Sequence, residues 1–171
     1  MTGVFIKMKN NERKGVKKMF EKILLPTDFS EAAGLALAKI KELKALGAKE
    51  VVVLHVIDRR DRYSIDDHMV QTMLSTKTLH ELEEKWKKYT DEQMSSVAAQ
   101  IEGQGIKITK VVREGIPAVE ILKAEKEEDI TDIVMASHGR SNIEDMFMGS
   151  VSDKVVRKCQ KPVYVIKCRK K

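Results

Sequence analysis

The stretch Glu50–Asp58 limits the possible folds of this chain more than any other part of the sequence. It reads EVVVLHVID, a nearly continuous run of apolar and mostly β-branched residues. A strand with one face in water alternates apolar with polar residues, and this run does not. Strands buried on both faces occur mainly in parallel sheets that carry helices on either side. We therefore expect a parallel sheet.

Similar apolar runs recur along the chain, with helical periodicity between them. The expected strands lie within residues 20–30, 50–58, 107–113, 132–137 and 161–167. The expected helices cover residues 30–46, 78–100, the segment that begins at Pro117, and 150–158. This alternation predicts a single-domain, doubly wound (Rossmann-like) α/β fold, with a five-stranded parallel sheet and helices on both faces. In such folds ligands bind outside the carboxyl ends of the strands.

The helix expected over residues 78–100 is amphipathic. The residues predicted to face the core recur at helical spacing, and they are Leu79, Leu82, Trp86, Tyr89 and Val97. Between residues 59 and 76 the periodic pattern is lost, so we assign no element there.

The net charge of +6 is concentrated at the two ends of the chain. Residues 1–18 hold six lysines and arginines against a single glutamate. We expect residues 1–18 to be a flexible basic arm and residues 19–171 to be the folded domain. Because the basic charge comes from the tails, it does not indicate a groove for nucleic acid, and we expect no nucleic-acid partner.

Two further features bear on where the protein works. No apolar run is long enough to cross a bilayer, so we expect no membrane partner and a cytoplasmic location. Cys159 and Cys168 lie too far apart for a CxxC motif, and we expect both to be reduced thiols.

A glycine-containing stretch, ASHGRSNIEDMFMGS, follows the fourth expected strand and leads into the last helix. Ser150 is the expected N-cap of that helix, and Asp153 is its expected partner in a capping box. The first amides of a helix and its positive dipole end attract anions. Gly139 would allow the preceding loop to fold over the same place. These residues fit a phosphate cradle, and they also fit an ordinary turn followed by an ordinary cap.

Several other patterns are absent from the sequence. There is no G-x-x-x-x-G-K-[ST] motif, which excludes a P-loop, and no G-x-G-x-x-G motif after the first strand. Ser137 and His138 are adjacent, and adjacent side chains rarely face each other as a nucleophile and its base do. His55 is expected to be a packed core residue. We therefore expect no catalytic residue and no protein-bound metal.

The glycine-containing stretch resembles the ATP-binding motif of universal stress proteins, G-x2-G-x9-G-[ST]. The four fixed positions fall on Ala136, Gly139, Gly149 and Ser150, and all but the first match. The segments ILLPTDFSE, VVLHVID, GIPAVEI and KPVYVIK also resemble that family, in the same order. The resemblance runs from about residue 19 to residue 167. It implies a strand order of 3-2-1-4-5 and a homodimer built through the last strand, residues 161–167.

The resemblance also implies a site for an adenine nucleotide. Asp28 would contact the base, with Pro26 and Thr27 beside it and the backbone of Val56 opposite. Met135, which precedes the motif, would line the pocket. The phosphates would lie on the motif loop and the start of the last helix, at Ala136, Gly139, Arg140, Gly149, Ser150 and Val151. The implied cofactor is ATP, with or without Mg²⁺ or Mn²⁺.

Ala136 stands where the motif has its first glycine. Alanine costs little if the backbone there has a negative φ, whereas a positive φ would force the loop to shift. We expect a cytoplasmic ATP-binding protein that acts as a regulatory switch in the stress response, with an unknown protein partner. One alternative is a nucleotide-free dimeric scaffold with a disabled pocket. Another is a slow ATP hydrolase or an AMP-forming enzyme that uses residues of the 59–76 segment.

Overall fold

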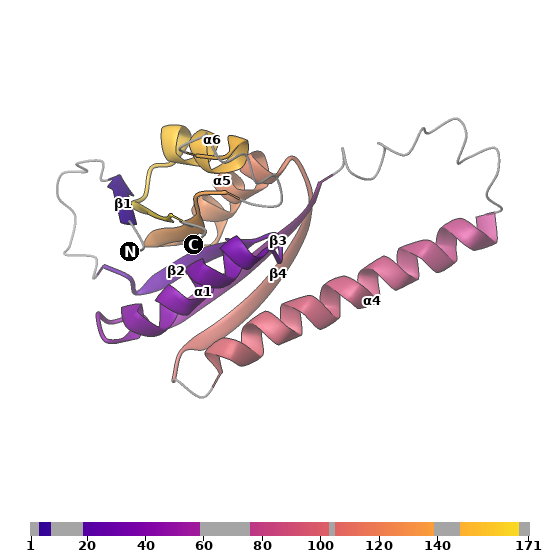
Figure 1. The fold of residues 1–171 in the computed structure, drawn as a ribbon, viewed down its shortest axis with the longest axis horizontal. Helices are drawn as coiled ribbons and strands as arrows, with labels where there is room; N and C mark the ends of the chain where they lie inside the picture. Colours follow the sequence, from indigo (N-terminus) through magenta and orange to yellow (C-terminus); the bar gives the residue numbers. More distant parts are fainter. Residues whose placement is uncertain (1–3, 8–18, 59–75, 103–104, 139–147, 168–171) are drawn as a thin grey trace.

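The computed structural model describes residues 4–7, 19–58, 76–102, 105–138 and 148–167 (Figure 1). The strands are β1 (Val4–Lys7), β2 (Lys22–Thr27), β3 (Glu50–Asp58), β4 (Lys107–Gly115), β5 (Asp132–Ala136) and β6 (Val163–Ile166). The helices are α1 (Glu31–Lys44), α4 (Thr76–Ile101), α5 (Pro117–Glu127) and α6 (Ser150–Lys158). All of the strands belong to one sheet, in the order β1-β6-β5-β2-β3-β4.

The five strands from β2 to β6 form the predicted parallel sheet. Taken in chain order they lie in the sequence 3-2-1-4-5, which confirms the expected topology. The chain reverses its direction of winding between β2 and β5, so the carboxyl ends of these two strands and of β3 open on a common crevice.

The edge strand β1 corrects the prediction for the start of the chain. We expected residues 1–18 to be a flexible arm, but Val4–Lys7 pair antiparallel with β6. The physical reason is that β6 would otherwise be an edge strand, with a row of backbone groups that need partners. The rest of that predicted arm lies outside the described residues.

Two hydrophobic layers hold the helices on the sheet. Along β2 and β3, every second residue faces α1 and α4, and the residues between them face α5 and α6. Ile23 and Leu25 belong to the first layer, and Leu24 and Leu54 belong to the second. Burial on both faces is what the unbroken apolar run of β3 predicted.

The helix α4 faces the core with other residues than predicted. Its buried side chains are Thr90, Met94, Ala98 and Ile101. Trp86 and Tyr89 were expected inside, but they are 49% and 55% exposed. In Figure 1 the N-terminal part of α4 extends past the sheet, so no layer of the described residues packs against it.

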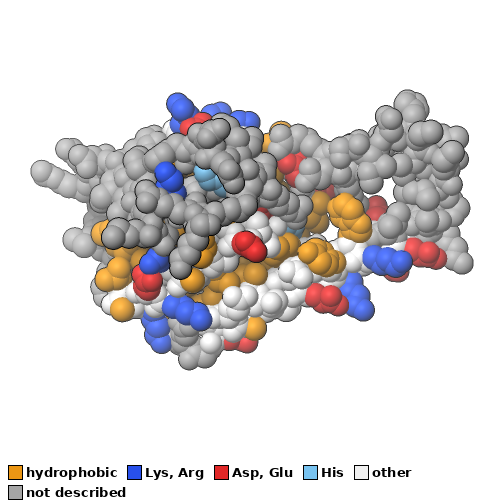
Figure 2. All heavy atoms as spheres, in the orientation of Figure 1, with side chains coloured by type: hydrophobic (Ala, Val, Ile, Leu, Met, Phe, Trp, Pro, Cys, Tyr) orange, Lys and Arg blue, Asp and Glu red, His pale blue; other side chains and the backbone are white. Residues whose placement is uncertain are grey.

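The surface of α4 is mostly charged. Figure 2 shows side chains of both signs along its projecting part, with hydrophobic side chains beside them. Val97 is half-buried, as predicted, while the side chains of Leu79 and Leu82 are not among those described. Across the described residues, no helix combines the length and apolar composition that crossing a membrane requires.

The cysteines were predicted to be reduced thiols. Cys159, at the end of α6, is buried, and its thiol donates to the Val156 carbonyl at 3.5 Å. Cys168 lies outside the described residues.

Candidate functional site

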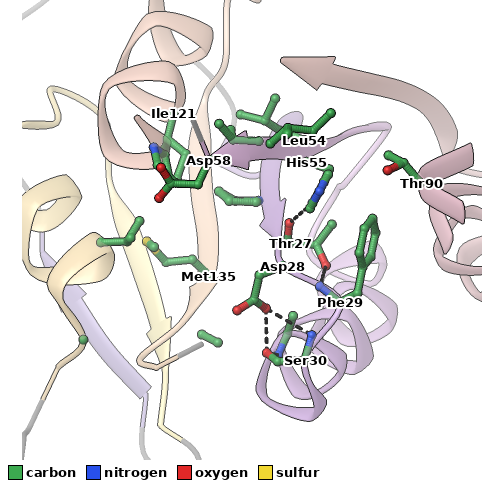
Figure 3. Close-up of a pocket in the computed structure, with 18 of the residues that line it drawn as sticks. Thr27, Asp28, Phe29, Ser30, Leu54, His55, Asp58, Thr90, Ile121 and Met135 are labelled. Atoms are coloured by element: carbon green, nitrogen blue, oxygen red, sulfur yellow. Dashed lines mark hydrogen bonds between the residues drawn. The ribbon is translucent and has the colours of Figure 1, made fainter. Parts of the chain in front are cut away.

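A pocket of about 920 Å³ opens at the carboxyl ends of the parallel strands (Figure 3). It reaches from the ends of β2, β3 and β5 to the start of α6 on one side and to α4 on the other. Pockets for small molecules commonly measure 300–1,000 Å³, so a nucleotide fits this volume. The lining residues that were predicted as a site are Pro26, Thr27, Asp28, Val56, Met135, Ala136, Gly149, Ser150 and Val151.

The chain turns sharply after β2, and the turn is held by side-chain hydrogen bonds. The Thr27 hydroxyl accepts from the Phe29 amide at 3.1 Å. Asp28 Oδ1 accepts from the Ser30 amide at 3.1 Å and from the Ser30 hydroxyl at 2.6 Å. Ser30 then caps α1 by accepting from the Ala33 amide. Asp28 is therefore a turn residue through Oδ1, and the turn holds its carboxylate at the pocket.

The turn also presents an aromatic pair to the pocket. Phe29 has a φ of 62°, a left-handed conformation that is uncommon for a bulky residue. Its ring stacks on the His55 ring, with centroids 4.2 Å apart and planes 24° from parallel. His55 Nδ1 lies 2.9 Å from the Thr27 carbonyl, and because a carbonyl only accepts, Nδ1 carries the hydrogen. His55 is buried as predicted, but it also lines the pocket.

The backbone conformation at Ala136 decides whether the first glycine of the motif is needed in this chain. Ala136 is the last residue of β5, and it is not among the residues with positive φ. A glycine is therefore not required there, and the methyl group of alanine costs little.

The start of α6 lies against the end of β5 at Gly149. Its amide donates to the Ser137 carbonyl at 2.7 Å. A Cβ atom at this position would lie 3.4 Å from the same carbonyl oxygen and 3.5 Å from the Cα atom of His138. The Ser152 hydroxyl donates to the Ser137 carbonyl at 2.6 Å, which fixes the first turn of α6 against β5.

The cap of α6 differs from the prediction. Gly149, rather than Ser150, is the N-cap, and it has no side chain to accept from the first-turn amides. Asp153 does not complete a capping box, because its carboxylate binds Arg157 Nε at 2.8 Å one turn further along. The helix therefore starts at the pocket without a side-chain cap, which is the arrangement that favours an anion.

The charged side chains that line the pocket have both signs. Asp28 and Asp58 lie at the ends of β2 and β3, and Lys85 lies on α4. In the part of the chain that is described, no group of three histidine, cysteine or acidic side chains is arranged to hold a metal ion. The positive end of α6 and Lys85 are therefore the features that would attract an anion.

The contact between Ser137 and His138 also differs from the expectation. Their side chains do meet, with the hydroxyl oxygen 3.0 Å from Nδ1. Ser137 is nevertheless 1% exposed and is not among the residues that line the pocket, so its hydroxyl cannot reach a substrate there. The hydrogen bond positions the His138 ring, which does line the pocket.

Sequence reasoning missed part of the pocket wall. Gly139 and Arg140, which were predicted to hold phosphates, lie outside the described residues. The lining residues that were not predicted include Phe29, His55, Asp58, Ile121, His138 and the α4 residues Lys85, Trp86, Tyr89 and Thr90. Phe29 and His138 follow β2 and β5, and Asp58 is the last residue of β3, so all three lie at the carboxyl edge where such folds bind ligands. The α4 residues carry no such signal.

Known proteins resemble this chain over most of its length. A family model described as the universal stress protein family matches residues 19–167. Universal stress protein MJ0577 of Methanocaldococcus jannaschii is 39% identical over 155 residues, which cover 87% of this chain and 96% of that protein. Universal stress protein YxiE of Bacillus subtilis is 27% identical over 149 residues, which cover 87% of this chain and all of that protein.

Solved structures agree with this assignment. The structure of MJ0577 matches with a TM-score of 0.75 at 37% identity, covering 90% of this chain and 99% of that one. A universal stress protein from Archaeoglobus fulgidus matches with a TM-score of 0.62 at 33% identity, covering 88% of this chain and 50% of that one. With the family model, the relatives and the fold in agreement, this chain belongs to the universal stress protein family.

Proposed function

We propose that the pocket binds ATP. The observation that carries the proposal is the start of α6, where Gly149 caps the helix without a side chain and Ser150 and Val151 line the pocket. First-turn amides of this kind suit a phosphate chain. Asp28, held at the end of β2, is the proposed contact for the base. A bound Mg²⁺ or Mn²⁺ on the phosphates stays a prediction.

We propose further that the nucleotide acts as a regulatory ligand in the stress response. A ligand shifts a conformational equilibrium only by its difference in affinity for the two states. The proposed switch therefore requires that ATP changes affinity for a protein partner. Homodimerisation through residues 161–167 and a cytoplasmic location remain predictions beside it.

The direct test is to purify the protein without added nucleotide, denature it and analyse the released small molecules, and then to titrate the emptied protein with ATP by calorimetry. We expect either co-purified adenine nucleotide or saturable binding with one site per chain. Neither result would occur in the nucleotide-free scaffold that is the main alternative, and the absence of both refutes ATP binding.

A catalytic role is the second alternative, and turnover separates it from the first proposal. We expect ATP hydrolysis in the presence of divalent metal to stay well below about 1 s⁻¹, a rate at the low end for enzymes. Ser137, the hydroxyl beside His138, is too buried to act as a nucleophile in the pocket. A faster rate would favour an enzyme over a switch.

A further inference from the structure

The pocket has two parts, one on each face of the sheet at its carboxyl edge. Val56 and Met135 line the first part and pack in the hydrophobic layer of α5 and α6. Phe29 lines the second part and packs on the layer of α1 and α4, and His55 points to that same face because side chains alternate along β3. In Figure 3, Met135 lies on one side of Asp28, and Phe29 and His55 lie on the other. The second part is therefore not used by the contacts proposed for the base and the phosphates.

Four ring side chains line this second part, and we call Phe29, His55, Trp86 and Tyr89 the aromatic subsite. The Phe29 and His55 rings stack on each other, with centroids 4.2 Å apart. Trp86 and Tyr89 come from α4 and are about half exposed. Within the described residues, neither of these two rings contacts another ring. Aromatic rings gain from stacking or edge contacts with a further ring, so these open faces suit a flat aromatic ligand.

One basic side chain accompanies the aromatic subsite. Lys85 is the only lysine or arginine among the described residues that line the pocket. Residues four apart on a helix are neighbours, which places Lys85 beside Tyr89. The two carboxylates of the pocket lie elsewhere, since Asp28 is held in the turn after β2 and Asp58 lies toward Ile121 in Figure 3. The charge next to the aromatic subsite is therefore positive.

We propose that the aromatic subsite binds a second small ligand, a planar aromatic ring that carries an anionic group. The ring would lie against the rings of the subsite, and Lys85 would attract the anion. The pocket volume of about 920 Å³ lies near the upper end of the range for a small-molecule site, which leaves room for a second ligand beside a nucleotide. The proposal does not depend on nucleotide binding.

The test uses 2-naphthoate as the probe, with two matched compounds as controls. Decahydro-2-naphthoate keeps the anion but has no aromatic ring, and 2-naphthamide keeps the ring but has no charge. The chain has one tryptophan, so the indole N–H of Trp86 gives a single signal in a proton–nitrogen NMR spectrum. That signal is followed while each compound is added to the full chain, and calorimetry gives the affinities.

We expect 2-naphthoate to shift the indole signal saturably, with a Kd below about 1 mM, as ligands of this size reach in a formed pocket. Each control compound should bind at least about twofold more weakly, because it loses either the ring contacts or the attraction to Lys85. An indole signal that does not move saturably would refute the subsite. Equal affinity for all three compounds would refute its assigned chemistry.

Substitutions at Trp86 test whether the ring itself binds the probe. Trp86→Leu should weaken 2-naphthoate binding at least about fivefold, whereas Trp86→Phe, which keeps a ring, should stay within about twofold of the unaltered chain. Leu46→Ala is the control, because Leu46 is an exposed apolar residue outside the pocket, and it should leave the affinity unchanged. If Trp86→Leu binds 2-naphthoate as tightly as the unaltered chain does, the subsite is wrongly placed.

Titration with ATP keeps the two proposals separate. We expect saturating ATP to change the Kd of 2-naphthoate by less than about threefold, because charges a Debye length apart are largely screened. Full competition between the two compounds would show one shared site and overturn the second subsite. Binding of 2-naphthoate without binding of ATP would refute the proposed function alone. Binding of ATP without binding of 2-naphthoate would refute the aromatic subsite alone.

Discussion

The carboxylate of Asp28 has one role that the structure shows and a second role that we propose. One oxygen accepts from the amide and the hydroxyl of Ser30, and this fixes the turn into α1. The proposed role toward the base needs the same carboxylate to accept from the exocyclic amine of adenine. Because the turn holds the side chain in place, the second role costs little additional ordering.

Substitutions at Asp28 separate these two roles. Asp28→Asn keeps an oxygen for the turn but loses the charge, so we expect nearly unchanged stability and a roughly tenfold smaller preference for ATP over GTP. Asp28→Ala should lose both the preference and part of the stability. Calorimetric titration with each nucleotide and thermal unfolding measure the two effects. A preference that survives both changes would show that the base is recognised elsewhere.

Tyr164 is the second residue whose surroundings predict a measurable change. Burial, together with the negative charge of Asp132, raises the pKa of Tyr164 to about 12. Its hydroxyl has no hydrogen-bond partner among the described residues, and its ring packs on Phe20 with centroids 4.7 Å apart. Ionisation of this phenol therefore opposes folding.

The sign of the effect follows from the raised pKa. The unfolded phenol ionises near its ordinary pKa of 10, so stability is lost as the pH rises from about 10 to about 12. We expect Tyr164→Phe to remove that part of the alkaline loss and to change stability little at neutral pH, since the hydroxyl is unpaired. In an ultraviolet titration of its tyrosines, the variant should also lack the phenol that ionises at the highest pH. If no phenol of the unaltered protein ionises late, the assigned environment is wrong.

At the scale of elements, α6 connects the fold to the proposed site. Its first turn is fixed to β5 through Gly149 and Ser152, both of which bond to the Ser137 carbonyl. The position of the helix start therefore depends on this contact between α6 and the end of β5.

Gly149→Val tests the role of this helix start. We expect ATP affinity to fall at least tenfold, because Gly149 lines the pocket and the methyl groups of valine would occupy space that the proposed phosphates need. Gly34→Ala is the matched control, since a Cβ there meets nothing within 4 Å and should add about 0.5–1 kcal/mol of stability in the interior of α1. Calorimetry and urea unfolding give the two numbers. Unchanged affinity in Gly149→Val would refute the role of the α6 start.

The position of α4 gives a second prediction for an element. Met94 is 2% exposed and packs in the layer with α1, whereas Trp86 is half exposed. We expect Met94→Ala to cost about 2–5 kcal/mol of unfolding free energy. Trp86→Ala should cost about 1 kcal/mol or less. Urea unfolding of both variants measures this difference. A larger loss of unfolding free energy in Trp86→Ala than in Met94→Ala would instead support the buried face that the sequence pattern predicted.

At the scale of the whole molecule, ligand binding and folding are linked. A ligand that binds the native state alone adds about 2.7 kcal/mol at a concentration of one hundred times its Kd. For a chain of this size we expect ATP at that concentration to raise Tm by about 5–11 °C. Gly149→Val should gain at most about half of that stabilisation at the same ATP concentration, because a tenfold weaker affinity leaves about 1.4 kcal/mol. If the Tm of the unaltered protein does not rise with ATP, the proposed binding is wrong.

The sequence by itself determined the class of fold, the five parallel strands and the order in which the site residues follow them. The physical reason is that burial on both faces and helical periodicity are properties of local residue order, which is readable in segments such as Glu50–Asp58. The resemblance to the universal stress protein family implied the strand order and placed Asp28, Met135 and Gly149 at one crevice.

Only the tertiary structure decided which face of α4 is buried, where α6 is capped and what covers β6. Trp86 is apolar at the right spacing, but the sheet ends before the helix does, and no local pattern encodes where a neighbouring layer ends. Asp153 has the spacing of a capping box, but its carboxylate forms an ion pair with Arg157, one turn further along the helix. The pairing of Val4–Lys7 with β6 joins the two ends of the chain, and contacts so distant in sequence depend on the assembled sheet.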